Sequence, residues 1–355
     1  MPFRDEDEFV QWLQRQWPGG ERGVGLGIGD DAAIIKPTPG CDLVLSTDLS
    51  LENVHFRLGL HPPRSVGHRA LARGLSDLAA MGARPRFALV SLTFSPKIGK
   101  RWLTEFYAGL GALAQRLGVT VIGGDTSVTG GAPVAVDVVA AGEVKRGKEL
   151  RRSGARPGDC LFVTGTLGFS ALGLEALKSG TSGAGAVRSR SPYQTAAARD
   201  SHAALQTHLY PEPRCAAGAY LAKRGLAAAA IDVSDGFARD LGRLCEASGC
   251  GARIREDQLP LPSLEGIRRV RDAGGSNKLD LGLYGGEDYE LIFTVRAANA
   301  SRVPRKAAGV AVHEIGEIRS KKGLVLVSSD GRETGLEPRG YDHFRRFADG
   351  HRSRS

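Results

Sequence analysis

Apolar residues recur at helical spacing in two long segments of the N-terminal half. From Ser65 to Met81 they fall every three or four residues and stop before Gly82, and the same spacing runs from Trp102 to Leu117, before Gly118. This period predicts two amphipathic helices. A glycine directly after the last apolar residue is typical of a helix C-terminus, so the helix ends are predicted as well.

Short runs of consecutive apolar residues alternate with helical segments along the whole chain. Runs of this length, bounded by glycine, proline or polar residues, predict strands that are buried in a sheet. A further helical segment, 237–247, stops shortly before Gly249, and another is expected after the turn at 165–168. The predicted strands cover residues 43–47, 87–94, 119–122, 134–144, 160–164, 226–231, 289–295 and 324–327.

The alternation of strands and helices predicts an α/β protein, of the α+β sandwich type, with two domains. The charged segment 145–152 reads as a linker between an N-terminal domain, 1–145, and a C-terminal α/β domain, 150–345. Residues 179–198 are rich in Gly, Ser, Ala and Arg and predict a mobile insertion, and the polar tail 346–355 is expected to be disordered. With 355 residues, 41% of them hydrophobic, each domain can form its own core.

Composition narrows the class of protein. The five cysteines form no CxxC pair and predict reduced thiols rather than a disulfide framework or a zinc site. The N-terminal segment 1–8 is acidic, whereas a secretory leader begins with basic residues and then turns apolar. Asp137 interrupts the apolar run 132–141, so this run is not expected to span a membrane. We therefore expect a cytoplasmic protein without a membrane partner. The net charge of +9 is spread along the chain and aromatic residues make up 6%, which favours a basic surface over nucleic-acid binding.

Aspartates recur beside glycines or at the ends of the apolar segments. Ligands bind at one edge of open α/β sheets, so these carboxylates are expected to converge there. Each single Asp could instead be a turn or N-cap residue, but recurrence in five segments favours a site for cations. Oxygen ligands without nearby His or Cys select Mg²⁺. The five segments contain Asp30 with Asp31, Asp48, Asp77, Asp125, and Asp232 with Asp235.

The glycine-rich segment 27–32 formally matches the dinucleotide-binding pattern GxGxxA. Such a site needs a helix N-terminus to bind the pyrophosphate, whereas here two carboxylates occupy the turn and residues 33–37 look extended. The P-loop pattern GxxxxGK[ST] is absent, because Lys100 is followed by Arg101. The sequence therefore argues against both of these nucleotide-binding motifs.

Taken together and in order, the segments resemble the thiamine-monophosphate kinase family over about residues 25–344. Two motifs, GGEDYEL and GYDHF, are much more specific than a single Gly-Asp pair. The sequence departs from the family at Asn53, where a small residue, usually Gly, is expected, and in the longer insertion at 179–198. The matching motifs are GIGDDA (27–32), STD (46–48), VHF (54–56), LSDLAAMG (75–82), IGGDT (122–126), RSGA (152–155), PGD (157–159), IDVSDG (231–236), GGEDYEL (285–291) and GYDHF (340–344).

This family belongs to the superfamily of aminoimidazole-ribonucleotide synthetase and selenophosphate synthetase. The resemblance implies two α/β domains, with the N-terminal sheets of two subunits paired across a homodimer and ATP bound near that interface. The N-terminal domain, 1–145, is then the part that binds ATP and Mg²⁺ and forms the dimer.

The resemblance also implies roles for individual residues. Without it, Tyr341 would be interpreted as a packed aromatic residue and His55 as a core histidine. The residues expected to hold several Mg²⁺ ions are Asp30, Asp31, Ser46, Thr47, Asp48, Asp77, Asp125, Asp232 and Asp235, with Asp30 and Ser46 as accessories. The expected ATP contacts are Tyr107, Gly124, Asp125, Arg152 and Ser234, and the expected contacts to thiamine monophosphate are His55, Glu287 and Tyr341.

The implied reaction transfers the γ-phosphoryl group of ATP to the phosphate of thiamine monophosphate. A phosphate monoester has a second pKa of about 6, so its oxygen is already deprotonated at neutral pH and no general base is expected. Direct in-line transfer assisted by Mg²⁺ follows. The alternatives are another ATP-dependent synthetase of the superfamily, which should lack GGEDYEL and GYDHF, and a basic nucleic-acid-binding module, which would leave the aspartates without a purpose.

Overall fold

The computed structural model describes residues 3–178, 196–262 and 277–344. Most of the insertion expected from the sequence, residues 179–195, and the expected tail, 346–355, therefore lie outside the described residues.

The chain divides into two compact units. Unit 1 consists of Met1–Leu150 together with Leu209–Gly225, and unit 2 consists of Arg151–His208 together with Leu226–Ser355. A segment from the second half of the sequence thus belongs to unit 1. The assignment of functional domains stays a prediction.

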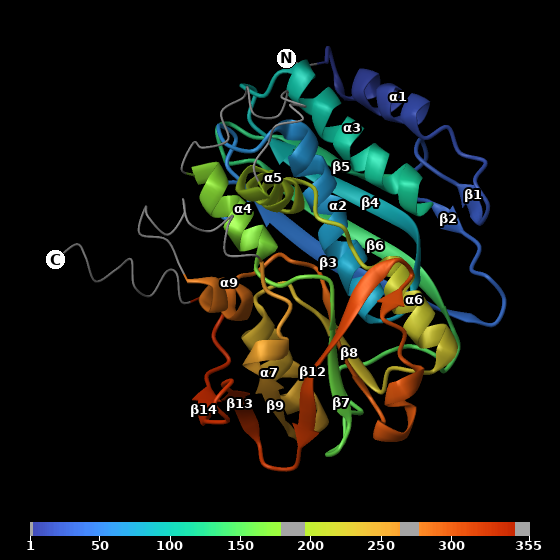
Figure 1. Cartoon of the computed structure of the whole chain (residues 1–355). Helices are drawn as coiled ribbons and strands as arrows, with labels where there is room; N and C mark the ends of the chain where they lie inside the picture. The colour runs from blue at the N-terminus through green and yellow to red at the C-terminus, as the bar shows by residue number, and fades with distance from the viewer. Residues whose placement is uncertain (1–2, 179–195, 263–276, 345–355) are drawn as a thin grey trace. The chain divides into compact units, whose positions relative to one another are not determined.

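Unit 1 is built on a four-stranded sheet whose one face is covered by the helices α2 and α3 (Figure 1). The strand order is β3-β6-β4-β5, in which β4 and β5 are parallel and the other neighbours are antiparallel. On the other face, Val24 and Ile35 of the hairpin β1-β2 pack against a small cluster around Phe87. The elements of unit 1 are α1 (Glu6–Gln16), β1 (Val24–Leu26), β2 (Ile34–Ile35), β3 (Cys41–Leu51), α2 (Pro63–Ala80), β4 (Arg84–Phe94), α3 (Lys100–Leu117), β5 (Thr120–Val128), β6 (Ala135–Lys145) and α6 (Cys215–Arg224).

The helices α2 and α3 cross so closely that their backbones touch. A Cβ atom at Gly67 of α2 would lie 1.9 Å from the carbonyl oxygen of Phe106, and one at Gly109 of α3 would lie 1.8 Å from that of Arg64. Both distances are far below any van der Waals contact, so each helix needs a glycine where it meets the other. The packing of the two helices therefore depends on two residues without side chains.

Helix α6 packs against the C-terminal half of α2 although it is distant in sequence. The Cys215 thiol lies 3.4 Å from the carbonyl oxygen of Leu75. A Cβ atom at Gly218 would lie 2.0 Å from the carbonyl oxygen of Ala79, which again marks a close approach of two backbones. The segment Leu209–Gly225 therefore completes the packing around α2.

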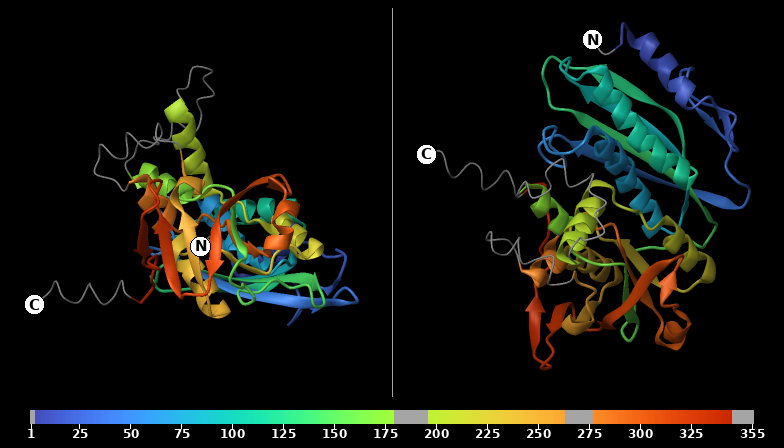
Figure 2. Two further views of the ribbon diagram at one scale, coloured as in Figure 1. Left: turned by 60° about the horizontal axis from the view of Figure 1, so that its bottom comes forward. Right: turned by 45° about the horizontal axis from the view of Figure 1, so that its top comes forward.

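The described part of unit 2 is built on an eight-stranded sheet. The strand order is β14-β13-β9-β12-β7-β10-β8, and β11 pairs with β12 outside this path. Figure 2 shows this sheet from two further directions. The elements of unit 2 are β7 (Cys160–Thr164), α4 (Phe169–Lys178), α5 (Ala196–Leu209, whose last residue is grouped with unit 1), β8 (Ala229–Asp232), α7 (Phe237–Ser248), β9 (Gly251–Arg255), η1 (Glu256–Gln258), α9 (Lys278–Tyr284), β10 (Leu291–Val295), η2 (Ala297–Arg302), β11 (Lys306–Ala307), β12 (Val310–Arg319), β13 (Gly323–Val327) and β14 (Glu333–Leu336).

The core of unit 2 lies between this sheet and the apolar face of α7. Phe237, Leu241 and Leu244 of α7 are fully buried in one cluster with strand residues such as Ile231 and Ile254. Helix α7 ends at Ser248 and is capped by Gly249, whose φ of +68° lies in the left-handed region that favours glycine. Helix α7 begins directly after residues 233–236. The packing of α7 therefore also fixes the position of this segment, which contains the predicted site residues Ser234 and Asp235.

The structure confirms the predicted α/β class, and several elements match closely. The strand predicted at 160–164 is β7, and the predicted helix ends before Gly82 and Gly118 agree with α2 and α3. Strands β3 and β5 are longer than predicted, because they continue through the polar residues after the apolar runs. No described helix combines the length and the hydropathy needed to cross a membrane.

The close crossing of α2 and α3 predicts that Gly109→Ala destabilises unit 1. The added methyl group would overlap the carbonyl oxygen of Arg64, so the helices must separate or shift, which costs about 1–3 kcal/mol or more. Urea unfolding followed by circular dichroism measures this change in the free energy of unfolding.

Gly111→Ala is the matched control in the same helix. A Cβ atom there would lie 3.5 Å from the Trp17 ring, an ordinary contact, and alanine favours the helix over glycine by up to about 1 kcal/mol. Equal stabilities of the two variants would contradict the close backbone contact.

Candidate active site

A cavity of ≈ 890 Å³ in unit 1 brings together five of the predicted site residues. It lies between α1, the loop that joins β1 to β2, and strand β5. Asp30 and Asp31 come from the loop, where the backbone N–H of Asp31 donates to the Asp30 carboxylate at 2.8 Å. The predicted residues that line the cavity are Asp30, Asp31, Tyr107, Gly124 and Asp125.

The close approach of β4 and β5 explains the glycine before Asp125. A Cβ atom at Gly124 would lie 1.9 Å from the carbonyl oxygen of Val90, its partner in the ladder, and the φ of +155° is one that other residues rarely adopt. Asp125 lies within β5, and its carboxylate accepts a hydrogen bond from the backbone N–H of Thr126 at 2.9 Å. The expectation that Asp48 and Asp125 follow the ends of their strands is therefore wrong, since both lie inside them.

Tyr107 closes the cavity from α3. Its side chain is 3% exposed and contacts the rings of Phe9, Trp12 and Trp17. Burial raises the pKa of the phenol, so the hydroxyl is neutral in the physiological range. Tyr107 can thus offer a ring edge and a hydroxyl, but no charge, to a ligand in the cavity.

Ser46, Asp48 and Asp77 form a second group, where β3 meets α2. The Ser46 hydroxyl donates to the Asp77 carboxylate, and Nη2 of Arg73 donates to the Asp48 carboxylate at 3.3 Å. Burial raises the pKa of Asp48 to about 6, Arg73 opposes this shift and the neighbouring Asp77 adds to it. Two carboxylates held this close together are a favourable place for a cation.

Thr47 is separated from this group by the pleat of β3. Successive side chains of a strand point to opposite faces, so Thr47 points away from Ser46 and Asp48. Its hydroxyl donates to the carboxylate of Asp137 on β6 at 2.9 Å. The structure therefore does not bring the Thr47 side chain together with Asp48 and Asp77.

His55 lies in a turn after β3 that depends on Asn53. The φ of Asn53 is +65°, a conformation that asparagine tolerates and glycine adopts freely, which explains why the family pattern leads one to expect a glycine there. Within the turn, the backbone N–H of Leu51 donates to Nδ1 of His55 at 2.9 Å, and Nη2 of Arg69 donates to the His55 carbonyl oxygen at 3.2 Å. The ring is thus held in a fixed orientation.

In unit 2, the turn at 233–236 between β8 and α7 is the centre of the candidate site. Asp232 is the last residue of β8 and is 3% exposed, whereas Ser234 and Asp235 lie in the turn. The backbone N–H groups of residues 234, 235 and 236 all donate to Oδ2 of Asp240, at 3.0, 2.9 and 3.2 Å. One buried carboxylate therefore fixes the conformation of the whole turn.

Two further predicted residues are attached to this turn through its carbonyl oxygens. The backbone N–H of Glu287 donates to the Ser234 oxygen at 2.8 Å, and that of Tyr341 donates to the Asp235 oxygen at 2.9 Å. Segments far apart in the sequence, IDVSDG, GGEDYEL and GYDHF, are thereby joined in one place. Arg152 stands apart in unit 2: it is exposed, and its carbonyl oxygen accepts from Ser248 at 2.9 Å.

The backbone around Glu287 is strained. Glu287 and Tyr289 have φ values of +65° and +52°, which residues with side chains seldom adopt. Such conformations persist where the surrounding structure enforces them, and they cluster at functional sites. Oε2 of Glu287 lies 4.0 Å from Nδ1 of the buried His208, which in turn contacts the Ser170 hydroxyl at 3.1 Å.

Asp288, between these two residues, points into the interior. Its carboxylate accepts hydrogen bonds from the backbone N–H groups of Gly168 and Ser170, at 2.6 and 3.0 Å, at the start of α4. Burial raises the pKa of Asp288 to about 7, and these two hydrogen bonds only partly oppose the shift. Neither Asp288 nor Asp240 was predicted from the sequence as a site residue. The sequence feature that could have identified Asp240 is its place in the first turn of a predicted helix that follows a glycine.

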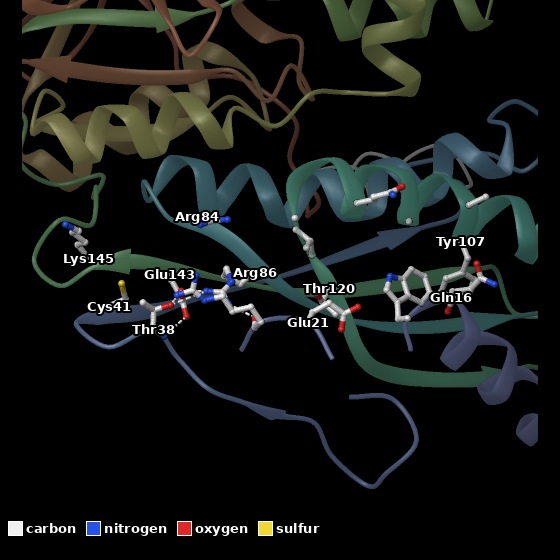
Figure 3. Close-up of a pocket in the computed structure, with 17 residues that line it drawn as sticks. Gln16, Glu21, Thr38, Cys41, Arg84, Arg86, Tyr107, Thr120, Glu143 and Lys145 are labelled. Atoms are coloured by element: carbon white, nitrogen blue, oxygen red, sulfur yellow. Dashed lines mark hydrogen bonds and ion pairs between the residues drawn. The ribbon is translucent and has the colours of Figure 1, made fainter. Parts of the chain in front are cut away.

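A second cavity of unit 1, of ≈ 810 Å³, shares Tyr107 with the first (Figure 3). Figure 3 shows Arg86, Glu143 and Thr38 together in its wall, where Arg86 pairs with Glu143 and the Thr38 hydroxyl donates to Glu143 at 2.7 Å. Burial raises the pKa of Glu143, but Thr38 and Arg86 outweigh burial and leave it lowered. Tyr107 is the only predicted site residue among those that line this cavity.

The arrangement of oxygen donors fits Mg²⁺ with phosphates rather than a metal held by protein alone. Within 3–178, 196–262 and 277–344, no three His, Cys, Asp or Glu side chains are grouped so that they could hold a metal ion. Mg²⁺ in phosphate-transferring enzymes is usually bound by one or two carboxylates together with substrate phosphates and water. The cavity with Asp30, Asp31 and Asp125 and the pair of Asp48 and Asp77 meet this requirement.

The raised pKa of Asp288 predicts a pH-dependent stability. As the pH falls from 8 to 5, the folded protein takes up a proton at about pH 7, whereas an unfolded Asp stays ionised until near pH 4, so the group favours folding more at the lower pH. The free energy of unfolding of the wild type, measured relative to Asp288→Asn, should rise by roughly 1–3 kcal/mol over this range. Urea titrations at the two pH values measure it, and a constant difference would contradict the prediction.

Two family models match the chain. The N-terminal domain of AIR synthase related proteins matches residues 29–144, and the C-terminal domain of the same proteins matches residues 156–329. The Salmonella typhimurium thiamine-monophosphate kinase is 39% identical over 324 residues, which cover 90% of this chain and 92% of the relative. The Bacillus subtilis thiamine-monophosphate kinase is 36% identical over 327 residues, which cover 91% and 94%.

Solved structures agree with the sequence relatives. The crystal structure of thiamine-monophosphate kinase from Stenotrophomonas maltophilia has a TM-score of 0.77 at 32% identity and covers 94% of this chain and 99% of its own. The structure of AaThiL complexed with AMPPCP and TMP has a TM-score of 0.71 at 30% identity, with coverage of 96% and 97%. The similarity spans both units, and the chain belongs to the thiamine-monophosphate kinase family of AIR synthase related proteins.

Proposed function

We propose that the protein is an ATP-dependent phosphotransferase that converts thiamine monophosphate and ATP into thiamine diphosphate and ADP. The observation that carries this function is the joining of IDVSDG, GGEDYEL and GYDHF around one turn of unit 2, in a chain 39% identical to a thiamine-monophosphate kinase. The related structure with AMPPCP and TMP supports both substrates.

The acceptor phosphate can attack ATP without the help of a general base. At neutral pH it is largely a dianion, so its oxygen is already nucleophilic, and no residue of the chain has to remove a proton. The obstacle is the repulsion between this dianion and the phosphates of ATP. The task of the protein is therefore to hold both anions in line and to surround them with compensating charge.

The carboxylates of the chain bind the cations that provide this charge. When bound, Mg²⁺ neutralises the phosphate oxygens and stabilises the transferred group. In unit 1, Asp30, Asp31 and Asp125 would hold ions at the cavity, and Asp48 and Asp77 would hold an ion beside Ser46, whereas the Thr47 side chain points away from this group. In unit 2, the corresponding residues are Asp232 and Asp235.

The remaining predicted residues divide between the two substrates. We assign Tyr107, Gly124, Arg152 and Ser234 to ATP and His55, Glu287 and Tyr341 to thiamine monophosphate. The carboxylate of Glu287 suits the cationic thiamine ring system. The Tyr341 ring offers a face to a flat cation, a contact worth roughly 0.5–2 kcal/mol.

A synthetase of the same superfamily is the less favoured alternative. Structures of the hydrogenase maturation protein HypE reach a TM-score of 0.71 at only 18% identity, so their likeness extends to the fold alone. The motifs GGEDYEL and GYDHF and the curated relatives all favour the kinase.

A homodimer in the cytoplasm is the proposed form of the enzyme. Leu43, Leu45 and Leu49 alternate along one face of β3, an edge strand of the unit 1 sheet, and are 39%, 65% and 49% exposed. An apolar row of this kind marks a surface that another chain covers. Pairing of two such sheets would bury these leucines.

The substrate assignment predicts a strong preference in an ADP-release assay. Thiamine lacks both the dianionic nucleophile and the phosphate that shares the cations, so its turnover should be at least ~100-fold below that of thiamine monophosphate. Chelating Mg²⁺ with EDTA should abolish turnover with either substrate. Equal rates with the two acceptors would overturn the proposed function.

The dimer predicts a mass of about twice 37.6 kDa by light scattering. Leu45→Asp places a charge in the apolar row and should shift the mass toward that of one chain. Phe344→Asp is the control, since Phe344 is 89% exposed and lies in unit 2. A wild type that is fully active as a single chain would contradict the dimer.

A further inference from the structure

Asp240 uses both of its carboxylate oxygens inside the protein. Oδ2 accepts the three backbone N–H groups of residues 234–236, and Oδ1 accepts Nη1 of Arg243 at 2.8 Å. The residue is fully buried in the first turn of α7. With no oxygen directed to solvent or to a cavity, Asp240 cannot itself bind a cation or a substrate, and its effect must pass through the turn.

Arg243 connects Asp240 to the candidate metal ligand Asp235. The same Nη1 that pairs with Asp240 lies 2.8 Å from Oδ2 of Asp235. The guanidinium thus bridges two carboxylates and fixes the direction of the Asp235 side chain, while Asp240 fixes its backbone. One oxygen of Asp235, Oδ1, stays outside this bridge.

Arg239, one helical turn before Arg243, extends the connection to the C-terminal motif. Its Nη1 lies 3.2 Å from Oδ2 of Asp342, and its Nε lies 3.8 Å from Oδ2 of Asp235. The backbone N–H of Tyr341 donates to the carbonyl oxygen of Asp235. The charges on α7 therefore hold the turn and the segment with Tyr341 in one arrangement.

We infer that Asp240 and Arg243 form a positioning pair that aims Asp235 at its cation and keeps the turn aligned with Glu287 and Tyr341. This inference rests on the proposed function, because it concerns how that reaction is supported. Side chains that orient metal ligands typically affect metal affinity or activity about 10–100-fold when they are changed. The two residues are expected to matter to this extent although neither touches a substrate.

Arg243→Met and Asp240→Asn test the pair in the full-length protein. Each variant should lower kcat for thiamine monophosphate about 10-fold or more and raise the Mg²⁺ concentration that gives half-maximal turnover about 10-fold or more. Arg243→Lys keeps the charge but loses the planar fork, so its values should fall between those of the wild type and of Arg243→Met. A purely structural role would lower the melting temperature and leave the Mg²⁺ dependence of the folded enzyme unchanged.

Arg253→Met is the matched control within unit 2. Arg253 is as exposed as Arg243, 37% against 36%, and it also pairs with two carboxylates, Glu317 and Glu333, but on the sheet. This variant should keep the kcat and the Mg²⁺ dependence of the wild type. If Arg243→Met and Asp240→Asn behave like Arg253→Met, the inference is overturned.

Amide hydrogen exchange gives a readout that does not require activity. Without ATP, the amides of residues 234–236 should exchange about 10-fold faster or more in Asp240→Asn than in the wild type, because an amide side chain holds them more weakly than a carboxylate. Amides of β9 serve as the internal control. Unchanged exchange at 234–236 overturns the inference. A wild type that releases no ADP overturns the proposed function instead. In that case the exchange rates still show whether Asp240 holds the turn.

Discussion

A carboxylate can be buried only where hydrogen bonds replace its lost water, and unit 2 depends on meeting this requirement twice. Asp240 takes up the three backbone amides of the turn at 234–236, and Asp288 takes up two amides at the start of α4. In both places a glycine-containing segment that would otherwise sample many conformations is held in one. The turn at 234–236 also positions Glu287 and Tyr341, because their backbone N–H groups donate to its carbonyl oxygens.

In unit 1, the site depends on which face of the sheet each polar side chain of β3 occupies. The pleat of β3 directs Ser46 and Asp48 toward α2 and Thr47 toward the opposite face, so neighbours in the sequence serve different surroundings. Asp48 is thereby held close to Asp77, and both residues are partly buried. A cation that arrived with a phosphate would relieve the repulsion between two such carboxylates, and phosphate oxygens and water would supply its remaining ligands.

The sequence predicted the elements that follow from periodicity and missed those that follow from tertiary contacts. Helices α2 and α3 were predicted with their glycine ends, because a 3.6-residue period and a left-handed residue are local properties. Strands β3 and β5 were predicted too short, since hydrogen bonds to neighbouring strands continue through polar residues that carry no apolar signal. Five predicted residues do line one cavity, and Ser234, Asp235, Glu287 and Tyr341 are joined in unit 2. Asp240 was missed because a buried Asp in a helix looks like a solvated one until its donors are known.

The place of α6 has a consequence for the order in which the protein can be made. The side of α2 that carries Leu75 and Ala79 is covered by residues 215–224, which a ribosome adds long after the last strand of unit 1. During that interval the side of α2 that α6 covers in the folded protein lacks this partner, and exposed apolar surface of this kind favours aggregation. Unit 1 is therefore complete only after residues 151–208 of unit 2 have been synthesised, so the folding of unit 1 depends on the progress of synthesis through unit 2.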